Sequence, residues 1–190
     1  MLTQMKYLAK VFVALLLAVT LALGGVQGRA NAGPIPIPDI SIDVNKTIDQ
    51  IIGLISTSQD FALMIANQTP ETLQRVGSYN YTSNWPLGDI DPLTASGQEW
   101  KENGLGYFSF ASNYAIGNTG RNFQFGASWP PVVSRKINVC ARNESGNKPA
   151  ELCWDKMSNS NDKTVTNAGF QSTATLRKKG NTVLWFYQVK

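Results

Sequence analysis

Residues 106–127 have the sequence GYFSFASNYAIGNTGRNFQFGA, and this stretch predicts a β-hairpin. Apolar and small polar side chains alternate in its first part, and Phe123 and Phe125 alternate in its last part, as in strands that bury one face. The segment Gly117-Asn118-Thr119-Gly120 between them has the composition of a tight hairpin turn. The stretch therefore favours a fold in which antiparallel strands dominate.

Further short strands are predicted on both sides of this hairpin. Residues 59–67 carry apolar side chains on both faces, so this strand is expected between two layers. A returning strand is expected at 73–81, whereas residues 84–97, rich in proline, glycine and aspartate, predict a long loop. Beyond the hairpin, the pattern predicts strands at 135–142, 151–154, 170–177 and 182–189. Short strands at this spacing indicate an antiparallel sandwich or barrel.

One amphipathic α-helix is predicted before the strands, at about residues 42–57. Its apolar residues have the spacing of one helical face; they are Val44, Ile48, Ile51, Ile52 and Ile55. Ser41 or Asp43 is expected to cap the start of the helix. Such a helix either packs on the sheets or lies at a membrane interface. Residues 33–40, in which every second residue from Pro34 to Pro38 is proline, predict an extended, flexible lead-in.

Residues 1–32 predict a secretory signal peptide. Lys6 and Lys10 give a positive start, an apolar run follows at 11–23, and Ala30-Asn31-Ala32 has the small-residue pattern that signal peptidase accepts. The alternative is a membrane anchor, but the apolar run is shorter than the roughly 18 residues that a spanning helix needs. We expect a secreted protein that is cut after Ala32 and forms one domain at 41–190.

Charge and composition exclude several classes of function. Residues 1–32 hold three of the 17 Lys and Arg residues and none of the 13 Asp and Glu residues, so the remainder carries 14 basic and 13 acidic residues. A nearly neutral chain is not expected to bind nucleic acid. The chain has no histidine, which excludes histidine-dependent hydrolases and histidine-ligated metals. Acid–base catalysis by two carboxylates stays formally open, but no clustered Asp and Glu pair in the sequence favours it. We therefore expect no enzyme, no cofactor and no metal site.

The two cysteines, Cys140 and Cys153, leave two readings open. In an exported protein they are expected to form a disulfide, and the alternative is a pair of buried thiols. Two cysteines without histidine are too few for a zinc site.

Several aromatic residues near predicted loops are candidate ligand contacts. Trp85 and Trp129 each precede a proline, and four tyrosines add to a candidate aromatic surface: Tyr79, Tyr81, Tyr107 and Tyr114. Exposed rings of this kind suit a membrane interface or the apolar face of a sugar. The alternative use of the same residues is to cover loops or to pack in the core.

Three features together resemble a known family. The predicted helix stands directly before the first strand in residues 51–67, residues 123–130 (FQFGASWP) form an apolar strand that ends in Ser-x-Pro, and residues 169–176 and 181–190 form a closing pair of strands. This order is similar to that of the actinoporin-like pore-forming cytolysins and of the fungal fruit-body lectins with a similar fold. The resemblance covers about residues 41–190.

The resemblance implies a mainly β fold, an antiparallel β-sandwich with one N-terminal amphipathic helix. It also implies docking on lipid head groups, insertion of the helix and assembly of several copies on the membrane. Carried over to this chain, Ser128 and Pro130 would lie at the head-group site, Trp154 would replace a family aromatic, and the helix at 44–55 would insert. The expected partner is a membrane lipid or a cell-surface glycan. The alternatives are a non-lytic lectin and a structural or adhesive secreted protein.

Overall fold

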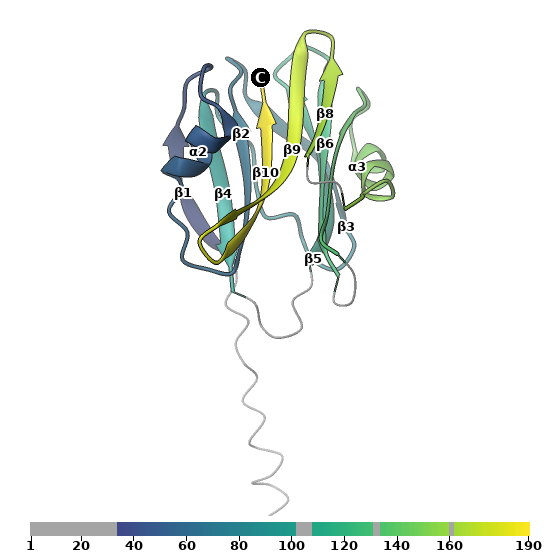
Figure 1. Cartoon of the computed structure of the whole chain (residues 1–190). Coiled ribbons are helices and arrows are strands. Elements are labelled where there is room, and N and C mark those ends of the chain that lie inside the picture. The colour runs from purple at the N-terminus through teal and green to yellow at the C-terminus, as the bar shows by residue number, and fades with distance from the viewer. Residues whose placement is uncertain (1–33, 102–107, 131–133, 160–161) are drawn as a thin grey trace, which may run out of the picture. The chain divides into compact units, whose positions relative to one another are not determined.

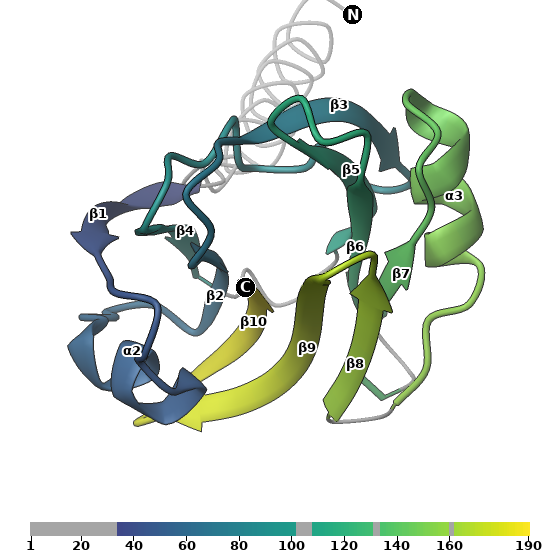
Figure 2. The same ribbon diagram turned by 90° about the horizontal axis from the view of Figure 1, so that it is seen from above.

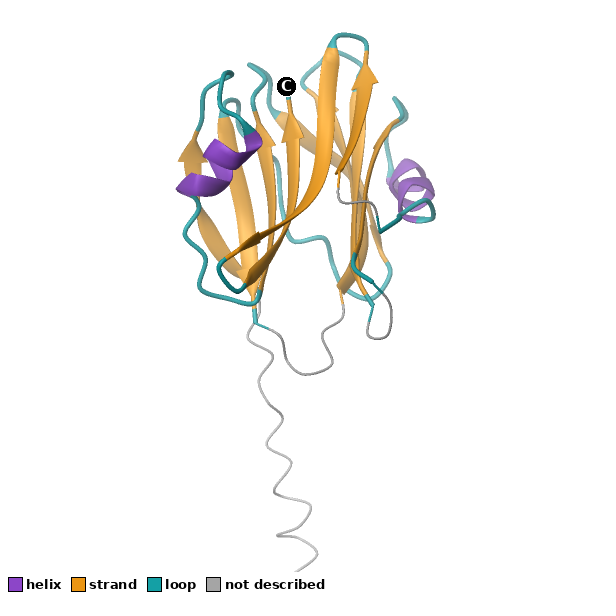
Figure 3. Ribbon diagram, in the orientation of Figure 1, coloured by secondary structure: helices purple, strands orange, loops and turns teal. Residues whose placement is uncertain are grey.

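A computed structural model describes residues 34–101, 108–130, 134–159 and 162–190, which belong to a unit that extends from Ala32 to Lys190. The signal peptide predicted at 1–32 lies outside the described residues. The described part of the chain is mainly β, with ten strands in two sheets (Figures 1 and 3). The predicted mainly β class is therefore confirmed.

The first sheet, sheet A, has six strands. In order across the sheet they are β1 (Ile35–Ser41), β4 (Thr94–Trp100), β2 (Phe61–Asn67), β10 (Thr182–Val189), β9 (Phe170–Lys179) and β8 (Asp162–Asn167). Sheet B has four strands, β3 (Leu73–Asn80), β5 (Phe108–Ile116), β6 (Asn122–Trp129) and β7 (Lys136–Ala141). The predicted hairpin at 106–127 corresponds to β5 and β6, which pair in antiparallel register.

The two sheets share one apolar core. Sheet A contributes Phe61, Leu63, Ile65, Trp185 and Tyr187, and sheet B contributes Phe108, Phe110, Tyr114, Phe123 and Phe125, among others. Aromatic rings meet edge to face across the core, for example Phe108 and Trp185 at 4.7 Å between centroids. Burial of such large side chains supplies most of the driving force for folding.

A second apolar layer covers the outer face of sheet A. Every residue of β2 is buried, as its apolar side chains on both faces predicted. Its outward side chains, Ala62 and Met64, contact Ile51, Ile52 and Ile55 of the segment that contains helix α2 (Ile48–Leu54). Figure 2 shows α2 outside sheet A and the second helix, α3 (Asn147–Trp154), outside sheet B.

The predicted helix is shorter than expected. It covers 48–54 and not 42–57, because β1 continues to Ser41 and Asp43 accepts a hydrogen bond from the Asn45 amide in a turn. Thr47, and neither Ser41 nor Asp43, caps the helix, in a capping box with Gln50. Val44 lies before the helix and is 56 % exposed.

Pairing between distant parts of the chain corrects two further expectations. Sheet A is not wholly antiparallel, because β10 pairs with β2 in parallel while it pairs with β9 in antiparallel register. Most of the flexible lead-in expected at 33–40 belongs to β1, an edge strand paired with β4. Proline is tolerated at a sheet edge because its missing N–H is not needed on the open side.

The loop predicted at 84–97 is confirmed up to Leu93 but not beyond it, and the strand predicted at 151–154 was wrong. Strand β4 begins at Thr94 and includes Gly97. The Gly97 backbone lies close to neighbouring β2, because a Cβ added at this glycine would be 2.9 Å from the Leu63 carbonyl oxygen. Residues 147–154 form α3, because Ala150 and Cys153 are three residues apart and both are buried. Pro149 falls in the first turn of α3, where a helix tolerates proline.

Lys179 holds the C-terminal end of α2. Its Nζ donates hydrogen bonds to the carbonyl oxygens of Ile52 at 2.6 Å and Gly53 at 2.9 Å, and also to that of Ile55. A cation at this position satisfies carbonyl groups that lack partners within the helix and stabilises the helix dipole. Helix α2 is thus fixed to sheet A by apolar contacts and by this lysine.

Replacing Lys179 with methionine is expected to lower the free energy of unfolding by about 1–2 kcal/mol, because several charge-assisted hydrogen bonds are lost. Hydrogen exchange at the amides of 51–55 should become faster. The control is Lys178→Met on the opposite face of β9, for which little change is expected. Equal exchange rates in the parent and the Lys179→Met variant would contradict this role.

Candidate functional site

The predicted Ser-x-Pro segment lies at one end of sheet B. Ser128 of β6 is directly opposite Ser109 of β5. Side chains alternate between the two faces of a strand, and Phe108 points into the shared core. Both serines therefore face outward, and Trp129 and Pro130 follow where β6 ends.

Helix α3 brings Trp154 to these serines. The helix packs on the outer face of sheet B and ends at Trp154. The indole Nε1 of Trp154 donates a 2.8 Å hydrogen bond to the Ser109 Oγ. Because the Ser109 oxygen accepts this bond, its hydroxyl proton can still be donated to another group.

Two tyrosines complete an aromatic cluster around Trp154. The Tyr81 ring lies 4.6 Å from the Trp154 ring between centroids, and the Tyr79 ring lies 5.2 Å away. The two tyrosine rings are stacked at 6.3 Å with 24° between their planes. Tyr81 is 60 % exposed, so its ring is available to a ligand.

A pocket of about 380 Å³ opens beside this cluster. It is named here the Trp154 pocket, and the lining residues that matter for its chemistry are Tyr81, Ser109, Ser128, Trp129, Pro130, Lys136, Trp154 and Asp155. The lining combines aromatic faces with the hydroxyls of Ser109 and Ser128. It also presents one cation and one anion, Lys136 and Asp155, and so suits a ligand that carries both charges.

The N-terminal end of α3 is fixed by a close backbone contact with β3. A Cβ at Gly77 would lie 2.1 Å from the Gly146 carbonyl oxygen, so only glycine permits this approach. The Gly146 amide donates to the Val76 carbonyl at 3.0 Å, and the Ser78 amide donates to the Asn147 side chain at 2.9 Å. These contacts set where α3 begins on sheet B.

The C-terminal part of α3 is fixed by a disulfide. Cys153 of α3 is bonded to Cys140 of β7, which confirms the first of the two readings of the cysteines. The Asn138 side chain also donates to the Cys153 carbonyl at 2.8 Å. Trp154 directly follows Cys153, so the disulfide positions the tryptophan of the pocket.

The structure gathers four of the six residues predicted to contact a ligand in the Trp154 pocket: Ser128, Trp129, Pro130 and Trp154. Trp85 is corrected: it is 4 % exposed, and its Nε1 donates to the Tyr114 hydroxyl inside the core, where it cannot reach a ligand. Tyr107 lies outside the described residues.

Residues that the sequence reasoning missed include Ser109, Tyr81, Lys136 and Asp155. The hairpin register offers a signal for the first of these, because it places Ser109 opposite Ser128. Tyr81 was noted only as part of a general aromatic surface. The helical form of α3, which directs Trp154 toward these residues, was not foreseen.

The five residues predicted to insert into a membrane do not form one exposed apolar face. Ile51, Ile52 and Ile55 are buried against the outer face of sheet A, and Ile48 is partly buried beside them. Val44 is exposed and lies outside the helix. The apolar face of α2 therefore already has a partner within the protein.

No protein-family model matches the chain, and no curated protein matches it. Among the described residues, no helix is long and apolar enough to cross a bilayer. Within the same residues, no group of three or more His, Cys, Asp or Glu side chains gathers where a metal ion would bind. The geometry of the Trp154 pocket is therefore the basis for the function proposed next.

Proposed function

We propose that the protein is secreted and binds membranes, with a β-sandwich that docks on zwitterionic phospholipid head groups through the Trp154 pocket. The observation that carries this proposal is the cluster of Tyr79, Tyr81 and Trp154 beside the Ser109 and Ser128 hydroxyls. The resemblance of residues 123–130 to the Ser-x-Pro strand of membrane-docking cytolysins points to the same site.

The aromatic cluster suits the quaternary ammonium of a choline head group. Aromatic faces attract such a cation when it lies within about 6 Å of the ring centroids. The rings of Tyr81 and Trp154 lie 4.6 Å apart between centroids and are inclined at 38°, so a cation beside the cluster can be close to both rings. The carboxylate of Asp155, which also lines the pocket, adds attraction for the same positive charge.

The other side of the pocket suits the phosphate of the same head group. Lys136 supplies a positive charge, and the outward hydroxyls of Ser109 and Ser128 supply donors. These three residues lie side by side on neighbouring strands, because Lys136 is opposite Ser128 and Ser128 is opposite Ser109. A donor set built on a sheet keeps its geometry without a ligand, which lowers the entropic cost of binding.

Docking of this kind does not require insertion of α2. The helix has seven residues, about 10 Å of length, whereas the hydrocarbon core of a bilayer is roughly 30 Å thick. Insertion would also require Ile51, Ile52 and Ile55 to leave sheet A and Lys179 to release three carbonyls. Pore formation and assembly on the membrane therefore remain predictions of the resemblance, separate from docking.

The proposal is tested by comparing phosphocholine with phosphoethanolamine in a titration followed by tryptophan fluorescence. Phosphocholine should bind several-fold more tightly, because its three methyl groups fill the aromatic cluster whereas a primary ammonium remains strongly hydrated. Vesicles of phosphatidylcholine should bind the protein in a flotation assay. Dye release from the same vesicles would show lysis in addition to docking.

Retention on immobilised glycans, without any response to phosphocholine or to vesicles, would overturn the proposal. That outcome would favour the lectin alternative, in which Tyr81 and Trp154 stack on a sugar ring. Binding of all vesicles in proportion to their negative charge would also count against docking on zwitterionic lipids.

A further inference from the structure

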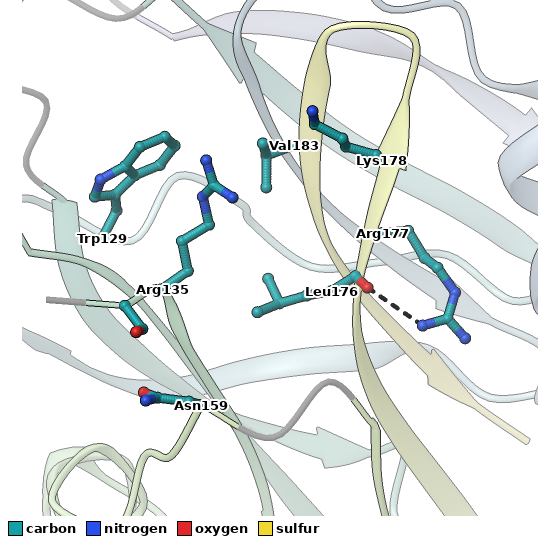
Figure 4. A pocket seen from close by; sticks show the side chains of 8 residues that line it. Trp129, Arg135, Asn159, Leu176, Arg177, Lys178 and Val183 are labelled. Carbon is teal, nitrogen blue, oxygen red and sulfur yellow. Dashed lines mark hydrogen bonds between the residues drawn. The ribbon is translucent and has the colours of Figure 1, made fainter.

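A second and larger pocket lies on the other side of Trp129. Its volume is about 650 Å³, and Trp129 is the residue that it shares with the Trp154 pocket. It is named here the Arg135 pocket, after the arginine on its wall. Leu176 and Val183 provide an apolar floor between β9 and β10, as Figure 4 shows.

Among the described residues that line the Arg135 pocket, every charged side chain is positive. Arg135, Arg177 and Lys178 line it, together with the polar side chains of Ser134 and Asn159. An apolar floor surrounded by cations and neutral donors, with no acidic side chain among the described lining residues, is suited to an anion.

Arg135 is held in place by an aromatic ring, and one of its N–H donors has no partner among the described residues. Its guanidinium carbon lies 4.2 Å from the centroid of the Trp129 ring, a cation–π contact that orients the planar group. The Nε atom is buried and has no hydrogen-bond partner within the part of the chain that the structure describes. A buried donor without a partner is costly, and a ligand that accepts its hydrogen bond would remove that cost.

Lys178 provides a second positive charge, whereas Arg177 is already engaged. In Figure 4 the side chains of Arg135 and Lys178 extend toward Val183 from opposite sides, and Arg177 turns away. Arg177 Nη1 is 3.0 Å from the Asp162 carboxylate and donates to the Leu176 carbonyl at 3.2 Å. The hydrogen bond from Thr175 lowers the pKa of Asp162, and Arg177 lowers it too, although partial burial opposes both. Asp162 thus stays ionised and keeps Arg177 paired.

We propose that the Arg135 pocket binds a phosphate-type oxyanion, with the Arg135 guanidinium as principal ligand and Lys178 as the second cation. A guanidinium presents parallel N–H donors that match two oxygens of a phosphate group. This site lies beyond the head-group docking proposed above, because its charged ligands, Arg135 and Lys178, do not line the Trp154 pocket and because it recognises negative charge alone. The phosphate can belong to free phosphate or to an anionic lipid, and the two sources are separated by experiment.

The test measures binding of inorganic phosphate to the purified protein by calorimetry, for the parent and for Arg135→Gln, Lys178→Gln and Arg121→Gln. Arg121 serves as the charge-matched control, because it precedes β6 at the opposite end from Trp129. The affinity should fall about tenfold or more in Arg135→Gln and severalfold in Lys178→Gln, with no change in Arg121→Gln. Circular dichroism and thermal melting should show that all three variants are folded.

A second arm uses vesicles of phosphatidylcholine with and without phosphatidic acid. If the acidic lipid strengthens binding and the same two variants abolish the gain, the source of the phosphate is a lipid. If the variants affect inorganic phosphate only, the ligand is a free phosphate, and the site stands in either case. Absence of phosphate binding, or equal losses in all three variants, would overturn the proposal. Phosphocholine binding, measured on Lys178→Gln, separates this result from any failure of the Trp154 pocket.

Discussion

Replacing Trp154 with alanine is expected to weaken phosphocholine binding about thirtyfold. A desolvated cation–π contact with a tryptophan contributes about 2 kcal/mol, and each 1.4 kcal/mol is a factor of ten in affinity. Trp154 is the central ring of the cluster, because both Tyr79 and Tyr81 contact it. Its loss removes one face of the cluster and also the hydrogen bond that orients Ser109.

The matched control is Trp154→Phe, which keeps a smaller aromatic face and removes the indole donor to Ser109. One hydrogen bond contributes about 1 kcal/mol, so the phenylalanine variant should lose roughly fivefold in affinity. Both variants should be titrated with phosphocholine and then melted, because Trp154 ends α3 and is not part of the shared core. A folded alanine variant that binds as tightly as the parent would show that Trp154 is no part of a binding site.

The second large effect is expected from removal of the Cys140–Cys153 disulfide. The bond closes a short loop, since the two cysteines are 13 residues apart. A crosslink of this size stabilises a protein by about 3 kcal/mol, mainly by restricting the unfolded chain. For a domain of this length that corresponds to a melting temperature lower by roughly 6–12 °C in a Cys140→Ala/Cys153→Ala variant. Alanine is chosen because Cys153 is fully buried, where a serine hydroxyl would need a partner.

The disulfide should also affect the ligand site, because Trp154 is held next to Cys153. Phosphocholine binding is expected to weaken in the double variant, and in the parent after reduction with dithiothreitol. The double variant itself should not respond to dithiothreitol, which controls for other effects of the reductant. An unchanged melting temperature after complete reduction, verified by thiol titration, would contradict this account.

Local sequence patterns predicted those parts of the fold that depend on neighbouring residues. The β5–β6 hairpin follows from alternation on either side of a glycine-rich turn. The two apolar faces of residues 61–67 correctly indicated a strand between two layers. In both cases the side-chain pattern along one segment reports which of its faces is covered.

Elements that depend on distant residues were not predictable in the same way. The parallel pairing of β2 and β10 joins segments about 120 residues apart, and no pattern within either strand records its partner. Helix α3 has eight residues, fewer than an isolated helix needs to be stable, so its form depends on the disulfide and on sheet B. Its cysteine and tryptophan are weak helix formers, which favoured the wrong expectation of a strand.

The candidate site was partly predictable for the same reason. Ser128, Trp129 and Pro130 are consecutive and carry the resemblance. Tyr81 follows β3 and Trp154 ends α3, and the two meet only when α3 packs on sheet B. Trp85 shows that residue type and sequence neighbours alone do not determine whether an aromatic side chain contacts a ligand. A tryptophan before a proline in a loop can serve a ligand or the core, and here it packs against Phe110 and Tyr114.

The most direct test of the proposed function is a crystal structure of the protein with phosphocholine bound. The trimethylammonium group should lie within about 6 Å of the ring centroids of Tyr81 and Trp154. The phosphate should accept hydrogen bonds from the side chains of Lys136 and Ser128. An empty Trp154 pocket at a saturating ligand concentration, or phosphocholine bound elsewhere with Trp154 untouched, would contradict docking through this pocket.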